Sequence, residues 1–142
     1  MNKRWLSAWL LCALFSCGNP AVEIKVTAEW PDGTPKRVVS IANGDTIEVA
    51  INDAQGRLTK VSRWRNGKAH GVWESFYPDG TTWSRHEYHE GVQLGLYQTW
   101  HPNGLPFIVG EYDSVGVPVG NWNFFDDMGK LIQTLPGDSI QL

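Results

Sequence analysis

Glycines and aromatic residues return at a constant step through the second half of this chain. Gly80, Gly104 and Gly129 are 24 and 25 residues apart. Two further glycine columns and three aromatic columns keep the same phase. They are Gly67, Gly91 and Gly116; Gly71, Gly95 and Gly120; Trp73, Tyr97 and Trp122; Phe76, Trp100 and Phe125; Trp64, Tyr88 and Tyr112. A period of roughly 20 to 50 residues indicates an array of structural repeats.

The array extends toward the N-terminus in weaker form. The stretch "WPDGT" at 30–34 echoes "YPDGT" at 77–81, but no earlier glycine matches the column of Gly71. Terminal repeats are often atypical because they cap the stack. We therefore divide the repeat domain into degenerate copies over 23–56 and clear copies over 57–135.

The residues between the glycines favour short β-strands. Runs such as "VWESFY", "LYQTWH" and "NWNFF" are rich in aromatic side chains, and Gly or Pro separates them at strand–turn spacing. In "PDG" and "PNG" the proline presets φ and the glycine can take positive φ, while "RNGK" is typical of a hairpin turn. We expect the nine glycines of the three columns to be structural turn residues. About ten strands should follow one another in a meander.

Side-chain alternation along the strands puts two aromatic ladders on opposite faces of the sheet. One ladder is Trp73, Tyr97 and Trp122, and the other is Phe76, Trp100 and Phe125. Aromatic cross-strand packing on both faces stabilises a sheet without a second layer. The predicted fold class is all-β, an elongated single-layer antiparallel meander of stacked hairpins.

Three units carry a resemblance to a known family. They are "NGKAHGVWESFYPDG" at 66–80, "EGVQLGLYQTWHPNG" at 90–104 and "VGVPVGNWNFFDDMG" at 115–129. The unit resembles the MORN repeat, in the variant of bacterial proteins titled antitoxin-like. This resemblance implies an elongated sheet of stacked hairpins and a scaffolding or binding role. The third unit departs from the pattern at 115–117 and has one extra residue, which leaves its turn geometry open.

The N-terminus has the pattern of a secretory signal peptide. Lys3 and Arg4 precede an uncharged and mostly apolar run over 5–15. This run is shorter than the about 20 residues that a membrane-spanning helix needs. The following "LFSC", ending at Cys17, resembles a bacterial lipobox. That resemblance implies cleavage before Cys17 and attachment of diacylglycerol to its sulfur, so we predict a lipoprotein signal peptide over 1–16.

The predicted anchor sets the location and the charge of the mature chain. Residues 17–22 would be the acylated cysteine and its tether, and residues 136–142 a C-terminal tail. We expect the protein to be exported and anchored to the cell membrane or the outer membrane. Gly18 after the cysteine favours the outer membrane. Removal of two cations with the signal changes the formal charge from −3 to −5, which disfavours nucleic-acid binding.

Catalytic chemistry has little support in the sequence. Cys12 leaves with the signal and Cys17 would be acylated, so no thiol remains for a disulfide, a zinc site or a nucleophile. His86 and His89 have an odd spacing that sends them to opposite faces of a strand, which disfavours a shared metal. Ser75 has no plausible histidine–acid partners. We expect no enzymatic activity, no metal and no cofactor.

The remaining function classes are binding classes. Trp and Tyr dominate binding hot spots, so the two aromatic ladders are the candidate binding residues. Our prediction is a scaffold that binds a protein partner in the cell envelope. The alternatives are an envelope glycan-binding module that uses Trp73, Tyr97 and Trp122, and an antitoxin-like inhibitor. Oligomeric state does not follow from the sequence.

Overall fold

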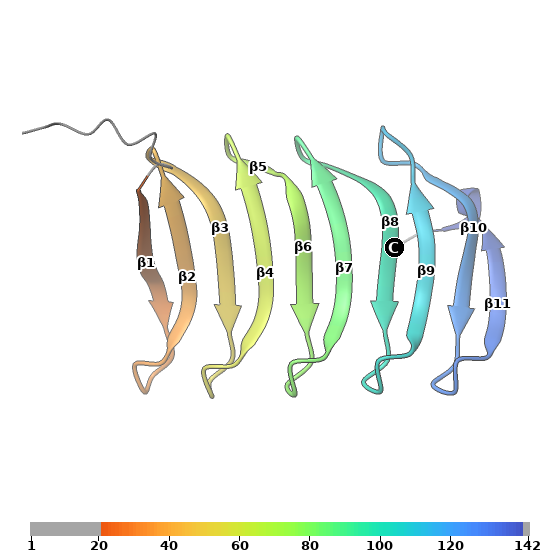
Figure 1. Cartoon of the computed structure of the whole chain (residues 1–142), viewed down its shortest axis with the longest axis horizontal. Coiled ribbons are helices and arrows are strands. Elements are labelled where there is room, and N and C mark those ends of the chain that lie inside the picture. Colours follow the sequence, from red (N-terminus) through yellow and green to blue (C-terminus); the bar gives the residue numbers. More distant parts are fainter. Residues whose placement is uncertain (1–20, 141–142) are drawn as a thin grey trace, which may run out of the picture.

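A computed structural model describes residues 21–140, which form one open antiparallel sheet of 11 strands. Neighbouring strands follow chain order, and the sheet has a single layer (Figure 1). The strands are β1 (Val22–Glu29), β2 (Pro35–Ala42), β3 (Asp45–Asn52), β4 (Leu58–Arg65), β5 (Lys68–Ala69), β6 (Gly71–Phe76), β7 (Thr82–His89), β8 (Val92–Trp100), β9 (Pro106–Tyr112), β10 (Pro118–Phe125) and β11 (Leu131–Pro136). The predicted all-β meander is confirmed. The signal peptide and Cys17 lie outside the described residues.

The turns along the lower edge of Figure 1 share one five-residue geometry. In the copy that begins at Tyr77, the Tyr77 N–H donates to Thr81 O at 2.8 Å and the Gly80 N–H donates to Tyr77 O at 2.9 Å. The same two bonds recur in the turns that begin at Trp30, Asp53, His101 and Asp126. The Asp79 carboxylate accepts the Thr81 N–H at 2.9 Å, and this bond lowers the pKa of Asp79. Pro-Asp-Gly therefore encodes the turn locally.

The turns along the upper edge are mostly two-residue turns of another kind. Both central residues have positive φ, as at Asn66 (50°) and Gly67 (73°). Asn43 with Gly44 and Glu90 with Gly91 have the same signs. This is the turn type whose twist matches that of the flanking strands, and it favours Asn-Gly.

The last upper turn, at 113–117, is different. The Asp113 N–H donates to Val117 O at 2.9 Å, which is the lower-edge pattern. The Asp113 carboxylate accepts the N–H groups of Val115 and Val117, each at 2.9 Å. The N–H of Val117 lowers the pKa of Asp113 most, followed by that of Val115. A five-residue turn on this edge accounts for the extra residue of the third clear repeat.

All nine predicted turn glycines have positive φ, between 63° and 92°. Most lie in hairpin turns, as predicted. Gly71, Gly95 and Gly120 differ from the prediction because they lie within β6, β8 and β10. Gly120 falls in the irregular stretch of β9–β10 pairing between Val119 and Asn123. Positive φ inside a strand bends it locally, which is the role of a glycine bulge.

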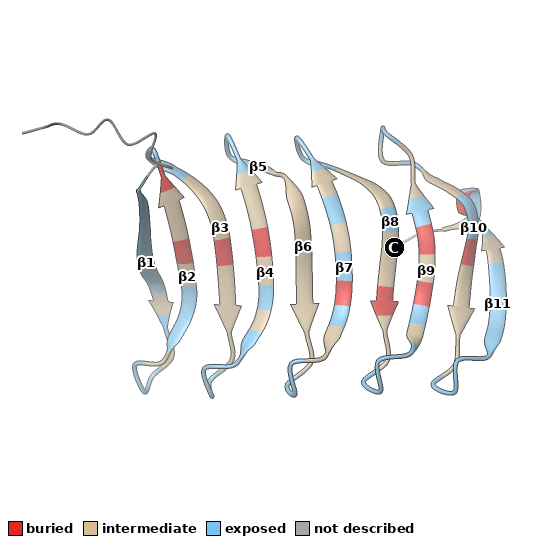
Figure 2. Cartoon of the chain, in the orientation of Figure 1, coloured by how far each residue is buried: buried red, intermediate tan, exposed pale blue. Residues whose placement is uncertain are grey.

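Six of the buried residues form a row of cross-strand partners on one face of the sheet. Val39 is opposite Val49, which is opposite Ser62; Ser84, Thr99 and Ile108 continue as partners further along. All six are buried, and Figure 2 shows buried segments on β2 to β4 and on β7 to β10. Two of the buried hydroxyls bond to the backbone, since Ser62 Oγ donates to Val49 O at 3.3 Å and Thr99 Oγ1 accepts the Ile108 N–H at 3.1 Å. A single-layer sheet thus has a core one side chain deep.

Side chains on the lower edge link successive repeats. The first residue of a turn reaches the carbonyl that precedes the next turn. Trp30 Nε1 donates to Asn52 O at 3.1 Å, and the Tyr77 hydroxyl donates to Trp100 O at 2.8 Å. The His101 Nε2 atom lies 2.9 Å from Phe125 O. These three bonds join neighbouring repeats independently of the sheet ladder.

Both ends of the described chain are more regular than the sequence suggested. The degenerate copies contribute β1 to β3, and β3 pairs with β4 of the clear copies. The predicted tail contains a 3-10 turn, Gly137–Ser139, which contacts β10. A Cβ atom at the buried Gly137 would lie 2.5 Å from Pro118 O, so glycine permits this close approach.

Candidate binding surface

One face of the sheet carries a continuous band of rings, which we name the aromatic stripe. Its members come from β4, β6, β7, β8, β9 and β10. They are Trp64, Trp73, His86, Tyr88, Tyr97, Tyr112 and Trp122. All except Trp122 are partly exposed. Rows of half-exposed rings are what a protein-binding face requires, because Trp and Tyr dominate binding hot spots.

The rings at the N-terminal end of the stripe pack at tilted angles. The ring centroids of Trp64 and Trp73 are 5.1 Å apart, and those of Trp73 and Tyr88 are 4.7 Å apart. Trp73 Nε1 donates to Arg63 O at 2.8 Å. The Lys60 ammonium lies 4.9 Å from the centre of the Trp73 ring. These contacts hold the Trp73 ring in one orientation on the surface.

The C-terminal end of the stripe is built around Trp122. Its ring centroid lies 5.0 Å from that of Tyr97 and 5.2 Å from that of Tyr112, the latter edge to face. Tyr97 and Trp122 belong to β8 and β10, so their contact crosses β9. Gly110 of β9 makes this contact possible, because a Cβ atom there would lie 2.2 Å from the Trp122 ring. Trp122 is completely buried at 0% exposure.

The first predicted ladder is therefore only partly one contact row. Tyr97 packs directly on Trp122, whereas His86 lies between Trp73 and Tyr97. His86 and Gly110 occupy equivalent positions, 24 residues apart. A side chain at this position occupies the space above the middle strand of three. It therefore determines whether rings on the two outer strands can touch. Because Trp122 is buried, only Trp73 and Tyr97 of this ladder have exposed ring surface, and Trp122 packs against Tyr97.

The second predicted ladder has no ring-to-ring contacts among the described residues. Phe76, Trp100 and Phe125 are all partly exposed. Trp100 lines a hollow with Glu74 and Arg85, which alternate with the stripe residues of the same strands. This ladder therefore lies on the opposite, charged face, where rings and ionic side chains are interspersed.

Two exposed aromatic residues were missed by the sequence reasoning. Trp83 and Phe107 are 24 residues apart, and their exposed fractions are 49% and 37%. Their spacing equals the repeat period, so they could have been recognised in the sequence as a further aromatic column. Trp83 lies beside the stripe, at the rim of a hollow that also contains Trp73 and Tyr97.

This hollow has a volume of about 240 Å³ and opens between β4 and β8. Trp73, Trp83 and Tyr97 form its aromatic walls, and Lys60 and Ser84 are among its polar lining residues. The mixture of rings, hydroxyls and one cation resembles the lining of small-ligand sites, where a few polar groups orient an otherwise apolar contact.

Near neutral pH the side chains of the stripe carry no charge, and the neighbouring Lys60 is a cation. Burial lowers the pKa of His86, and the charge of Lys60 lowers it further. A neutral His86 accepts a hydrogen bond from Gln93 Nε2 at 3.3 Å, while Gln93 Oε1 accepts one from the Tyr88 hydroxyl at 3.2 Å. Burial also raises the pKa of Tyr97. The surface thus offers rings and neutral polar groups.

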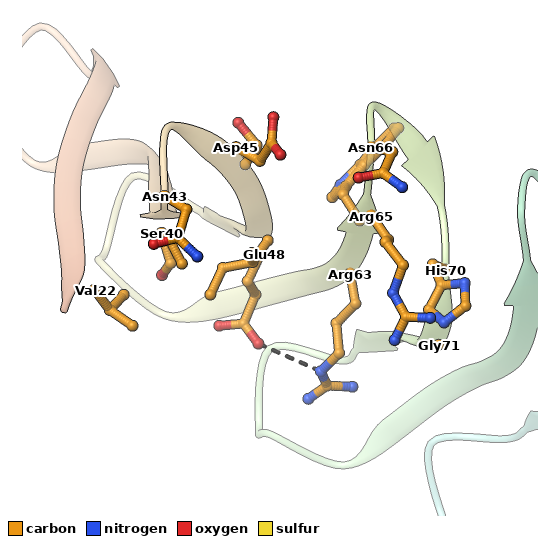
Figure 3. Close-up of a pocket in the computed structure, with 14 residues that line it drawn as sticks. Val22, Ser40, Asn43, Asp45, Glu48, Arg63, Arg65, Asn66, His70 and Gly71 are labelled. Carbon is orange, nitrogen blue, oxygen red and sulfur yellow. Dashed lines mark ion pairs between the residues drawn. The ribbon is translucent and has the colours of Figure 1, made fainter. Parts of the chain in front are cut away.

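A larger hollow of about 720 Å³ lies on the upper edge, between two hairpin turns (Figure 3). The sequence analysis did not find it, and none of the predicted aromatic binding residues lines it. Its charged residues balance, with Asp45 and Glu48 against Arg63 and Arg65. Arg63 Nε lies 3.4 Å from the Glu48 carboxylate, so this arginine is already paired. The charges therefore favour neither an anion nor a cation.

The histidines are arranged for packing. The His70 and His89 rings are in contact, with centroids 4.9 Å apart. His86 instead packs on Tyr97, so His86 and His89 have different neighbours. Within residues 21–140, no group of three His, Cys, Asp or Glu side chains is placed to hold a metal ion.

Comparisons with family models, with curated proteins and with solved structures return no match. The resemblance to MORN repeats therefore stays a prediction from the sequence. Across the part of the chain that the structure describes, no helix is long and apolar enough to cross a membrane. The repeat architecture itself follows directly from the sheet topology.

Proposed function

We propose that this protein is an exported, lipid-anchored repeat scaffold that binds a protein partner of the cell envelope without catalysing a reaction. The observation that carries the proposal is the aromatic stripe, whose partly exposed Trp and Tyr rings extend from β4 to β9. Extended aromatic surfaces on soluble domains mark sites of protein interaction. The tilted ring packing suits a broad and preorganised contact face.

The anchoring part of the proposal rests on the sequence around Cys17. Only residues 18–21 separate this cysteine from the first strand. Such a link spans at most about 15 Å when fully extended. The sheet would therefore stay close to the membrane. Replacement of Cys17 by Ser should release the protein from the membrane pellet, and retention of Cys17→Ser in that pellet would contradict the anchor.

The binding test compares two variants with matched loss of apolar surface. Trp83→Ala removes an exposed ring at the stripe, whereas Leu96→Ala removes a side chain that is 53% exposed on the charged face. Crosslinking in intact envelopes followed by pull-down should recover a protein partner with the parent chain and with Leu96→Ala, but less with Trp83→Ala. Equal recovery by both variants would reject the part of this face around Trp83, Trp73 and Tyr97 as the binding surface. Circular dichroism checks that both variants are folded.

A second candidate function is binding of an envelope glycan. The hollow bounded by Trp73, Trp83 and Tyr97 favours it, because aromatic walls with Ser84 and Lys60 beside them can stack on and hydrogen-bond a sugar ring. Titration with envelope polysaccharides should then quench the tryptophan fluorescence of the parent chain more than that of Trp83→Ala. Absence of quenching across the panel would remove this alternative.

A further inference from the structure

The first strand of the sheet has an open edge. β1 pairs with β2 on one side, and within residues 21–140 no strand pairs with its other side. Its apolar side chains are among the most exposed in the chain, with 52% for Val22, 70% for Ile24 and 47% for Val26. An open edge with exposed β-branched residues is a template for another strand.

The opposite edge of the sheet is less suited to accept a strand. β11 ends at Pro136, which has no N–H to donate. The chain then turns back against β10 through Gly137–Ser139. Residues Val22 to Val26 contain no proline, and all five pair one to one with β2 before the first register shift, whereas one-to-one pairing of β11 covers only Gln133 to Pro136 and includes the proline. The regular and unprotected edge is therefore the β1 edge.

Two antiparallel copies of β1 have complementary side chains along their shared edge. Glu23 and Lys25 alternate with Val22, Ile24 and Val26, so charges and apolar groups lie on opposite faces. A two-fold axis through Ile24 places Glu23 opposite Lys25 of a second copy and Val22 opposite Val26 of that copy. Opposite charges and β-branched pairs that face each other across antiparallel strands are stabilising.

We propose that two copies of this chain pair through their β1 edges, antiparallel and with the two-fold axis at Ile24. The product is one continuous sheet with a β11 strand at each end. Such a contact is isologous and closes after two subunits, whereas pairing of β1 with β11 would continue into a filament. The inference does not depend on the proposed function, because no residue of the aromatic stripe takes part.

The first test reverses one charge at a time. Glu23→Lys places Lys opposite Lys across the proposed axis, and Lys25→Glu places Glu opposite Glu. Each variant alone should dimerise about tenfold more weakly than the parent full-length chain in detergent, as measured by sedimentation. An equimolar mixture of the two variants should recover the dimer, because every cross-strand pair is then of opposite sign.

The mixing experiment distinguishes an ion pair between two chains from the ion pair that Glu23 and Lys25 form within one chain. Lys25 Nζ already lies 3.2 Å from the Glu23 carboxylate of its own strand, and each single reversal breaks that contact too. Only a contact between two chains can be restored by mixing. A monomeric parent chain, dimers unaffected by either reversal, or a mixture no better than its components would each overturn the proposal.

The second test locates the axis and does not require the charge variants to fold. Ile24→Cys places two cysteines opposite each other in the dimer, within reach of a disulfide. Mild oxidation should crosslink this variant into dimers, and Thr27→Cys should crosslink far less because it lies away from the axis. Ladders larger than a dimer, or equal crosslinking at both positions, would reject the two-fold arrangement. The Trp83→Ala variant should retain the dimer, even if it loses the binding function.

Discussion

Gly110→Ala is expected to destabilise the C-terminal half of the sheet through a single methyl group. The added Cβ atom would lie 2.2, 2.4 and 2.5 Å from three atoms of the Trp122 ring. Trp122 has no exposed surface and is held by Tyr97 and Tyr112 on its sides. Either the ring must leave its place, or β9 and the ring must move apart.

These two responses give an upper and a lower limit for the decrease in the free energy of unfolding. A Trp ring buries about 200 Å². At about 25 cal/mol per Å², its complete expulsion into water would cost up to about 5 kcal/mol. A rearrangement that keeps the ring buried but strains the packing costs about 1–3 kcal/mol. Because the protein takes the less unfavourable response, we expect a loss of about 2–3 kcal/mol.

Urea unfolding followed by circular dichroism measures this loss, and hydrogen exchange locates it. In a repeat protein, stability is approximately a sum of local terms, so protection should fall in β9, β10 and β11 and stay unchanged in β2 to β4. Gly120→Ala is the matched control. It has positive φ but nothing within 4 Å of its Cβ position, so only the backbone cost of about 1–2 kcal/mol applies.

A double-mutant cycle tests the stated cause. In a Trp122→Ala background, Gly110→Ala should change the free energy of unfolding by less than about 1 kcal/mol, because the ring is absent. The reasoning is refuted if Gly110→Ala is as stable as the parent, or if its cost persists after the ring has been removed.

Three further predictions concern a turn, a link between repeats and a partly buried imidazole. Asp113→Ala should lower the midpoint of urea unfolding, and Asp113→Asn, which keeps an acceptor oxygen, should lower it less; equal effects would argue against the hydrogen bonds as the cause. Tyr77→Phe should cost about 1 kcal/mol in urea unfolding through the lost bond to Trp100 O, and an unchanged midpoint would show that the link is unimportant. His86 has a folded pKa below its ordinary 6.5, with burial and Lys60 as the causes. The unfolded chain therefore binds more protons, and this part of the stability is fully present above the unfolded pKa and is lost as the pH falls through the folded pKa. His86→Gln should flatten the decline in stability from about pH 7 to about pH 5, and a slope equal to that of the parent would contradict this account.

Much of the fold could be predicted because its determinants are local. Pro78, Asp79 and Gly80 specify one turn through their own φ preferences and one carboxylate bond. In the turns at 53–57 and 126–130, an aspartate at the first position accepts the turn N–H groups instead. The exception at 113–117 follows the same rule, since Asp113 supplies the carboxylate that its turn requires. Turn chemistry needs no information from distant residues, so it can be recognised in a short stretch.

The candidate site was predicted less completely because ring exposure depends on neighbouring strands. The sequence treats Trp73, Tyr97 and Trp122 as equivalent members of one column. In the structure Trp122 is buried, while Trp83, in another column, is half exposed. The difference lies in what each neighbouring strand places beneath the ring. Gly110 leaves room for Trp122 to cross β9, whereas the equivalent His86 fills that space in the preceding repeat.

The repeat period, the strand and turn pattern, and the separation of two aromatic ladders can therefore be predicted from the amino-acid order, because each follows from the spacing of side chains along the backbone. Which rings are buried, where a hollow opens, and which edge of the sheet accepts another strand depend on the folded sheet. These properties are set by contacts between residues about 10 to 25 positions apart, across strands about 4.8 Å from each other, where a single side chain more or less changes the packing.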